Sequence, residues 1–144
     1  MENETMGRVL TEATIENLQD AFDAKRQMIS AEQVRRVTVP DARVDTGATL
    51  LSLPTRLIRQ LGLEEQYRKR VRSSVGVSEA GVYDAVRLII QGRICTMDVM
   101  EVPDDTPVLI GQLPLEQLDF VVDMRSHSLI GNPAHGGEHM FELY

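Results

Sequence analysis

Hydrophobic and polar positions alternate over much of this chain with the two-residue period that is typical of β-strands. The segments that show this alternation, or that form short runs of β-branched residues, are 8–15, 33–47, 70–75, 81–102, 106–111, 118–123 and 127–131. A hairpin turn is predicted at Gln91-Gly92, inside the longest of them. The pattern therefore predicts seven or more strands.

Helical spacing is confined to short stretches. Residues 16–29 carry apolar side chains at spacings that suit one helix face, although a long irregular connection fits them nearly as well. Residues 53–62 predict a short helix, because Pro54 suits its first turn and Gly62 suits its end. A turn or short helix is expected at Pro114. Since helices do not alternate regularly with strands, the predicted class is mostly β.

Two local signals refine the predicted strands. Pro40 lies inside the segment 33–47 and marks a bend or an edge strand, because proline cannot donate a hydrogen bond to a neighbouring strand. The sequence GVSEAG, residues 76–81, lies between two strand-like segments. It is predicted to be the glycine-bounded tip of a β-hairpin.

The length of 144 residues suits one domain, 1–144, with a core of about 7–133 and a tail rich in Gly and His over 134–144. The net charge of −7 argues against nucleic acid as a partner, because phosphate binding needs clustered cations. One basic cluster, residues 68–70 with Arg72, is interpreted as a solvated strand or turn, with an acidic partner as the alternative.

No apolar run is long enough to cross a bilayer, so no membrane partner is expected. The single cysteine, Cys95, excludes an internal disulfide and fits a reducing compartment. The N-terminus is acidic and polar where a signal peptide would be basic and then apolar. We therefore expect a cytoplasmic protein.

One carboxylate, Asp45, stands between an apolar strand and a Thr-Gly pair in the sequence VDTGAT. Taken alone, an aspartate in this setting is usually a turn residue that bonds its own backbone. Farther along the chain, residues 108–111 read VLIG. The two motifs together, in an otherwise β chain, resemble the aspartic proteases and in particular the small single-lobe retropepsins of bacteria. The resemblance runs from about residue 34 to residue 133.

The resemblance implies a closed, barrel-like retropepsin fold with one or two short helices. It also implies endopeptidase activity, in which two aspartates share one proton and activate a water molecule. Because the chain holds one Asp-Thr-Gly, the second carboxylate must come from a second copy. The expected enzyme is a homodimer that acts on a peptide or protein substrate and needs no metal or cofactor.

The resemblance also assigns roles to the neighbours of Asp45. Thr46 is expected to hydrogen-bond across the dimer, and Gly47 to let the backbone turn tightly. Ala48 lacks the hydroxyl that a serine would offer to the ionised carboxylate, so we expect activity at mildly acidic to near-neutral pH.

Two further segments take roles from the same resemblance. Leu109, Ile110 and Gly111 are expected to pass behind the catalytic loop and to close a ψ-shaped loop that supports it. The hairpin around residues 74–81 is expected to be a flap that closes over substrate. The flap residues predicted to contact substrate are Ser74, Val75, Gly76, Val77 and Ser78.

The tail contains HGGEH, residues 135–139, which has the spelling of an inverted zinc-protease motif. That chemistry needs a helix, and Gly136-Gly137 disfavours one. No third ligand is recognisable, so the tail is expected to be flexible, tag-like or part of an interface.

Other reactive or unusual residues receive structural interpretations. Cys95 is expected to be a buried, inert thiol, and His127 a solvent-facing strand residue. Met97, Met100 and Met124 are expected to fill the core. Asp123 is expected at a strand end or turn, and Asp41 and Asp119 have no catalytic context.

Two alternatives to the aspartic endopeptidase stay open. The first is a non-catalytic module that keeps the retropepsin fold for dimerisation or peptide binding. The second is a zinc protease that uses the tail.

Overall fold

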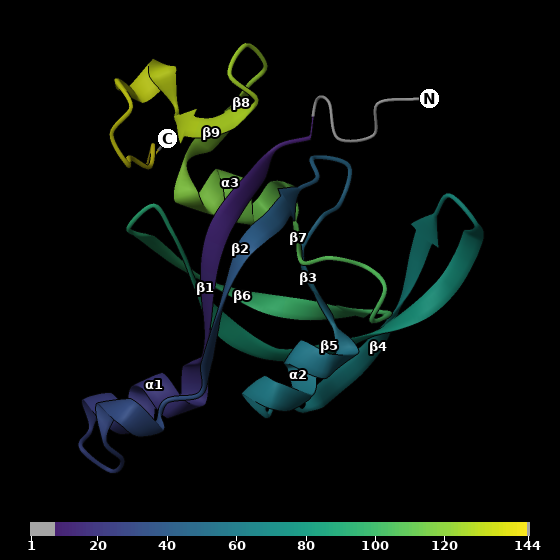
Figure 1. Ribbon diagram of the computed structural model, residues 1–144, viewed down its shortest axis with the longest axis vertical. Coiled ribbons are helices and arrows are strands. Elements are labelled where there is room, and N and C mark those ends of the chain that lie inside the picture. The colour runs from purple at the N-terminus through teal and green to yellow at the C-terminus, as the bar shows by residue number, and fades with distance from the viewer. Residues whose placement is uncertain (1–7, 144) are drawn as a thin grey trace.

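The computed structural model describes residues 8–143 and shows a mostly β fold, as predicted (Figure 1). Its strands are β1 (Leu10–Asn17), β2 (Arg36–Val44), β3 (Leu51–Pro54), β4 (Glu65–Ser73), β5 (Gly76–Ile90), β6 (Arg93–Val102), β7 (Leu109–Ile110), β8 (Phe120–Asp123) and β9 (Ser128–Gly131). Its helices are α1 (Leu18–Lys25), α2 (Thr55–Leu61) and α3 (Gln112–Leu118), with single 3-10 turns η1 (Ala31–Gln33) and η2 (Pro133–His135). Within this range no helix is both long and apolar enough to span a bilayer.

Six strands close into a barrel. Around the barrel the order is β1, β2, β7, β3, β6 and β5, and a β1–β5 pairing completes the ring. β4 pairs with β5 alone and keeps one free edge. β8 and β9 form a separate hairpin.

The short strand β7 lies between β2 and β3. It runs parallel to β2 and antiparallel to β3. β2 and β3 follow each other in the chain, joined by residues 45–50, but a strand from much later in the sequence separates them. This arrangement ties the loop 45–50 to the segment that contains the second sequence motif.

A β-bulge at Pro40 and Asp41 sets the orientation of the second half of β2. These two residues face one position of β1, because the register shifts between Thr11 and Ala13. A bulge adds one residue to a strand and so reverses which side chains face inward beyond it. Pro40 therefore marks a bend, as predicted, and β2 is an interior strand of the barrel rather than an edge.

The helices begin and end where local signals allow. α2 confirms a helix within the predicted range 53–62, but it begins at Thr55, and Pro54 is its N-cap in β3 rather than part of its first turn. The helix ends at Gly62, whose left-handed φ of 70° suits a residue without a Cβ. Residues 18–25 form the helix α1 rather than an irregular connection, capped by the Asn17 side chain. α3 begins at Gln112, two residues before Pro114.

Each barrel strand supplies a fully buried side chain to one core. These residues are Ile15 in β1, Ala42 in β2, Leu51 and Leu53 in β3, Leu88 in β5, Val99 in β6 and Ile110 in β7. Leu57, Ile58 and Leu61 of α2 and Leu115 and Leu118 of α3 pack against the same core. Burial of these side chains provides the main stabilising free energy.

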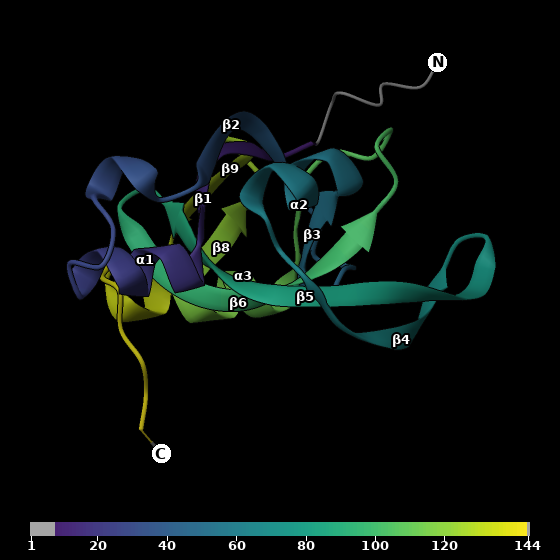
Figure 2. The ribbon, with the colours of Figure 1, turned by 90° about the horizontal axis from the view of Figure 1, so that it is seen from below.

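The molecule is longer than its barrel. Along the long axis, α1 lies at one end and the β8–β9 hairpin with the tail lies at the other (Figure 1). The outer parts of β4 and β5 leave the barrel sideways as a two-stranded extension (Figure 2). We call residues 65–82 the arm.

Several sequence-based predictions were wrong in detail. The turn of the arm is Ser74-Val75, and residues 76–81 belong to β5, because Ser73 pairs directly with Gly76. Residues 76–79 are exposed on both faces of the strand, and burial begins at Ala80 and Gly81. His127 is exposed, as predicted, but it lies in the β8–β9 turn with φ 52° rather than in a strand.

The three methionines differ from one another. Met97 is buried in the core and Met100 is partly buried. Met124 is 66% exposed in the β8–β9 turn, so its prediction as a core residue was wrong.

Candidate active site

Asp45 lies at the point where β2 leaves the barrel. Its backbone N–H still donates to the Ile110 carbonyl at 2.9 Å, as in a continued strand, and its carbonyl accepts from Ala48 N at 3.0 Å in a tight turn. The carboxylate is therefore held at the position directly after β2, before the chain reverses.

The bulge decides which way Asp45 points. Ahead of the bulge, Val37 and Val39 face the core, at odd positions. Beyond it, Ala42 and Val44 face the core, at even positions. Asp45 therefore projects away from the core and is partly exposed.

Within residues 8–143, the carboxylate of Asp45 has one hydrogen-bond partner. Gly47 N donates to Asp45 Oδ1 at 3.0 Å. A Cβ on Gly47 would lie 3.3 Å from the same oxygen, so the glycine permits this close approach. Within the described residues no ion pair neutralises Asp45, which leaves acceptor sites for a ligand, a proton or water.

The neighbours of Asp45 face outward. Thr46 and Gly47 are exposed, and Ala48 is partly buried. Thr46 therefore presents a hydroxyl at the surface beside Asp45. A second molecule could reach it there.

The segment 109–111 supports this loop from within. Gly111 N donates to the Leu50 carbonyl at 3.0 Å, and Gln112 N donates to the Ala48 carbonyl at 2.8 Å. A Cβ at Gly111 would lie 2.4 Å from the Leu50 carbonyl oxygen, closer than atoms can approach. Leu109 and Ile110 form β7, so all three predicted support residues lie beside the loop.

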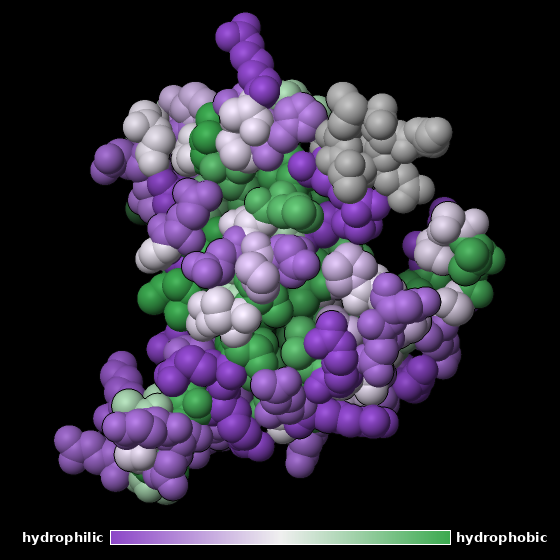
Figure 3. Space-filling view, in the orientation of Figure 1, coloured by the Kyte–Doolittle hydropathy of each residue, from purple (hydrophilic) through white to green (hydrophobic). Residues whose placement is uncertain are grey.

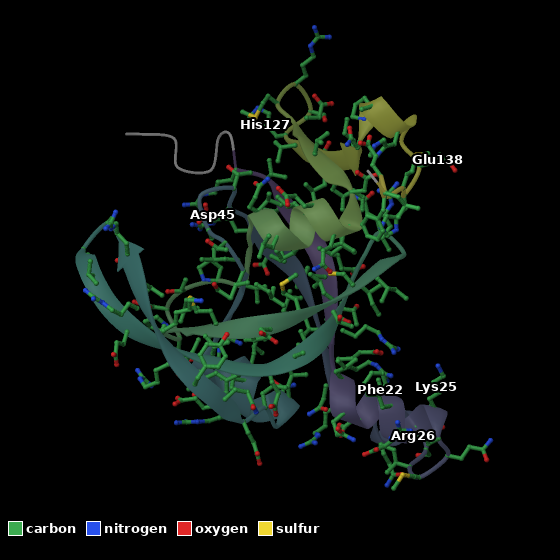
Figure 4. All side chains as sticks on the ribbon, turned by 180° about the vertical axis from the view of Figure 1, so that it is seen from behind. Phe22, Lys25, Arg26, Asp45, His127 and Glu138 are labelled. Atoms are coloured by element: carbon green, nitrogen blue, oxygen red, sulfur yellow. The ribbon has the colours of Figure 1, made fainter. Side chains whose placement is uncertain are left out.

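The arm stands on the same side of the molecule as Asp45 (Figure 4). Of the predicted flap residues, Ser74 and Val75 form its turn, and Gly76, Val77 and Ser78 begin β5. All five are exposed. A space-filling view shows a notch between the arm and the body and an apolar patch at the arm's end (Figure 3), where Val75 is 92% exposed.

A separate hollow lies away from Asp45. It has a volume of about 540 Å³ between the tail, α3 and the β5–β6 hairpin. Cys95 lines it, but burial raises the pKa of that thiol to about 11, so the thiol is protonated and a poor nucleophile at neutral pH. This agrees with the predicted buried, inert cysteine. Among the described residues, the hollow offers no activated nucleophile.

Asp119 is a second carboxylate with a defined environment, and sequence reasoning missed it. It ends α3 with a left-handed φ of 59° and is 7% exposed. His135 Nδ1 lies 2.7 Å from Asp119 Oδ2, and Met140 N donates to the same oxygen at 3.1 Å. The hydrogen bond from His135 is the main reason that the pKa of Asp119 is held below its usual range. The histidines of the nearby tail were the sequence signal that could have indicated a partner for Asp119.

The tail is therefore attached to the body rather than free. His135 Nε2 lies 2.9 Å from Glu142 Oε2, and His139 Nε2 lies 2.9 Å from the Gln117 carbonyl oxygen. The hydrogen bonds to the Asp119 and Glu142 carboxylates raise the pKa of His135. In the part of the chain that the structure covers, no cluster of three or more His, Cys, Asp or Glu is placed to hold a metal ion.

The remaining carboxylates are in simple positions. Asp123 ends β8 and accepts hydrogen bonds from Arg125 N and Ser126 Oγ, which confirms it as a turn residue. Asp41 lies exposed in the bulge of β2.

Two comparisons with known proteins gave no match. The chain matches no protein-family model, and no curated protein matches it significantly.

Proposed function

We propose that this chain is an aspartic endopeptidase of the retropepsin type that acts as a homodimer. The observation that carries the proposal is the Asp45 loop. The Asp45 carboxylate faces outward from an exposed Asp-Thr-Gly turn and accepts one hydrogen bond among the described residues, from Gly47. Strand β7 lies behind this turn and holds it through backbone hydrogen bonds. The closed barrel is compatible with the fold that the resemblance implies.

The chemistry needs two carboxylates close together. When two carboxylates lie about 3 Å apart, they share one proton, because both cannot be ionised at once. The ionised member takes a proton from water as the water attacks the peptide carbonyl, and the protonated member stabilises the developing oxyanion. Asp45 supplies one carboxylate of this pair.

A second copy of the chain is the source of the other carboxylate. The sequence has one Asp-Thr-Gly. The other carboxylate with a defined environment, Asp119, already has its oxygens bonded to His135, Asn132 and Met140. Thr46 is exposed beside Asp45 and free to hydrogen-bond across a two-fold axis. A symmetric dimer places the same loop opposite itself.

The arm completes the proposed site. Its edge strand β4 has unpaired backbone groups, and its end carries the exposed apolar residues Val75 and Val77. An extended peptide can pair with such an edge, and apolar residues at the tip can exclude water as the arm closes.

The decisive experiment compares wild-type protein with Asp45→Asn on a peptide library at several pH values. We expect cleavage by the wild type and a loss of at least about a hundredfold in the variant, the usual effect of removing an acid–base group. Asp98→Asn is the matched control, because Asp98 is exposed on β6 and should leave the rate unchanged. Cleavage by Asp45→Asn at the wild-type rate would disprove the mechanism.

The dimer is tested by sedimentation. The active species should have about twice the chain mass of 16.1 kDa, and activity per chain should fall on dilution as the dimer dissociates. A monomer with full activity contradicts the shared site. A dimer that binds peptides but cleaves none supports the non-catalytic module instead.

A further inference from the structure

Arg43 lies in β2, two residues before Asp45. Two residues apart beyond the bulge, Arg43 and Asp45 leave the strand on the same outward side, opposite to the core-facing Ala42 and Val44. The strand neighbours of Arg43 are Leu10 in β1 and Leu109 in β7. Arg43 therefore places a positive charge between two leucines, two residues before Asp45 on the same face of the strand.

The guanidinium of Arg43 is incompletely satisfied. Its Nε is buried and has no hydrogen-bond partner, and among the described residues it is the one buried side-chain nitrogen or oxygen in that condition. No carboxylate of the described chain forms an ion pair with it. A buried donor without an acceptor is unfavourable. Because the Arg43 residue as a whole is partly exposed, its guanidinium is open to solvent elsewhere and is suited to receive an acceptor from a ligand.

The arm carries a local excess of positive charge. Residues 65–82 contain four cationic and two anionic side chains, whereas the whole chain has a net charge of −7. Arg68 is paired with Glu65 at 3.2 Å and with Glu79 at 3.5 Å. The other cations, Lys69, Arg70 and Arg72, are exposed and form no ion pair within the described chain.

These two groups of cations flank the same site. Arg43 lies in the strand that ends at Asp45, and the arm extends on the Asp45 side of the barrel (Figure 4). Since the arm is net +2, the rest of the chain has a net charge of −9 and repels acidic ligands. Cations concentrated around the site offset that repulsion locally.

We infer that the substrates of this site are acidic polypeptide segments, in which Arg43 binds a Glu or Asp side chain near the cut bond. Lys69, Arg70 and Arg72 bind acidic residues farther along the same extended segment, which pairs with the free edge of β4. The inference rests on the proposed endopeptidase function, because it defines the substrate class of that site. A guanidinium pairs with a carboxylate through two parallel hydrogen bonds, which favours acidic over amide side chains.

The test uses two fluorescent peptides with the same apolar centre, one with Glu and one with Gln at the flanking positions. Their binding is measured by anisotropy with the Asp45→Asn protein, which does not consume them. We expect the Glu peptide to bind about tenfold more tightly, the size of one charge-assisted hydrogen bond, and the preference to weaken as salt is added. Equal affinity for the two peptides would overturn the inference.

Variants in the same background locate the preference. Arg43→Met should reduce the Glu-to-Gln ratio toward one, and Arg43→Lys should retain part of it, because the charge stays while the planar fork is lost. Arg70→Gln/Arg72→Gln should reduce the ratio less. The matched control is Lys25→Gln/Arg26→Gln, which removes two cations at the far end of the molecule (Figure 4) and should leave the ratio unchanged.

Other outcomes separate the two proposals. If the control lowers the ratio as much as the arm variant does, net charge alone explains the preference and the inference is wrong. If Arg43→Met and Arg43→Lys both sediment as monomers, Arg43 belongs to a dimer contact and the inference is also wrong. If the wild type cleaves both peptides equally, the protease proposal stands and the substrate class does not. If the wild type cleaves neither peptide but the Glu-to-Gln binding ratio holds, the preference for acidic segments stands and the protease proposal is wrong.

Discussion

Asp45 and Asp119 each follow the end of a regular element, β2 and α3, yet the fold treats the two carboxylates differently. Asp119 is 7% exposed, and His135, Asn132 and Met140 occupy its oxygens. Asp45 is partly exposed and accepts one hydrogen bond, from Gly47. The first carboxylate connects two parts of the chain, and the second is left available at the surface.

The difference shows how a structural aspartate can be distinguished from a reactive one. A carboxylate whose acceptor sites are filled by its own chain stabilises the fold and has little capacity left for a ligand. A carboxylate that the backbone positions but does not saturate can still bind water, a proton or a partner. The Asp45 loop is positioned mainly by backbone contacts, whereas the Asp119 cluster is positioned by side chains.

The largest expected effect concerns the backbone support of the Asp45 loop. Gly111→Ala should lower the free energy of unfolding by about 3 kcal/mol, because its Cβ would meet the backbone of residues 48–50 and the barrel has no space to yield. Gly47→Ala should cost less than about 1 kcal/mol, because its Cβ meets only the Asp45 carboxylate oxygen. Denaturant unfolding of both variants measures the contrast. Equal destabilisation by the two substitutions would show that close packing of Gly111 against residues 48–50 does not support the Asp45 loop.

The sequence predicted the elements of this region better than their orientation. The apolar strand before Asp45, the helix ending at Gly62 and the Gln91-Gly92 turn follow from local patterns, and all three are present. The outward direction of Asp45 does not follow, because uninterrupted alternation from Val37 would turn it toward the core. The bulge at residues 40–41 corrects this, and Pro40 indicated a bend without giving its register.

The Asp119 cluster was not predicted, for a different reason. Its partners lie 13 or more positions away in the chain, so no local pattern connects them. The tail was expected to be flexible, tag-like or part of an interface, because Gly136-Gly137 disfavours a helix. The same two glycines have left-handed φ values, which let the chain fold back onto the body. The short strand β3 escaped notice as well, because four fully buried residues show no alternation.

The next largest effect concerns how much each of the two aspartates contributes to the stability of the fold. Asp119→Asn should lower the melting temperature by several degrees, because the His135 ring and the Met140 N–H lose their charged acceptor. Asp45→Asn should change it by no more than about one degree, since a partly exposed group with one bond is removed. Calorimetry on both variants gives the comparison. A larger shift for Asp45→Asn would mean that Asp45 is mainly structural.

The smallest effect is a pH dependence confined to the tail. The pKa of His135 is raised by its hydrogen bond to Asp119, so its contribution to tail docking is complete below the ordinary histidine pKa of about 6.5 and is lost as the pH rises through the raised value. The pKa of Asp119 is lowered by the same bond, so its contribution is complete above the ordinary carboxyl pKa of about 3.9 and is lost as the pH falls through the lowered value.

The tail should therefore be held most strongly to the body between about pH 4 and pH 6.5. The measurement is hydrogen-exchange protection of the Met140 amide, which donates to Asp119, corrected for the intrinsic exchange rate at each pH. In His135→Gln the decline at higher pH should disappear, because a neutral amide carries no proton to lose. Protection that stays constant from pH 5 to about pH 9 in the wild type would mean that the charged His135–Asp119 pair does not hold the tail. In that case the hydrogen bonds of Asp119 would contribute little to the stability of the fold, and Asp119 would be similar to Asp45 in this respect despite its larger number of partners.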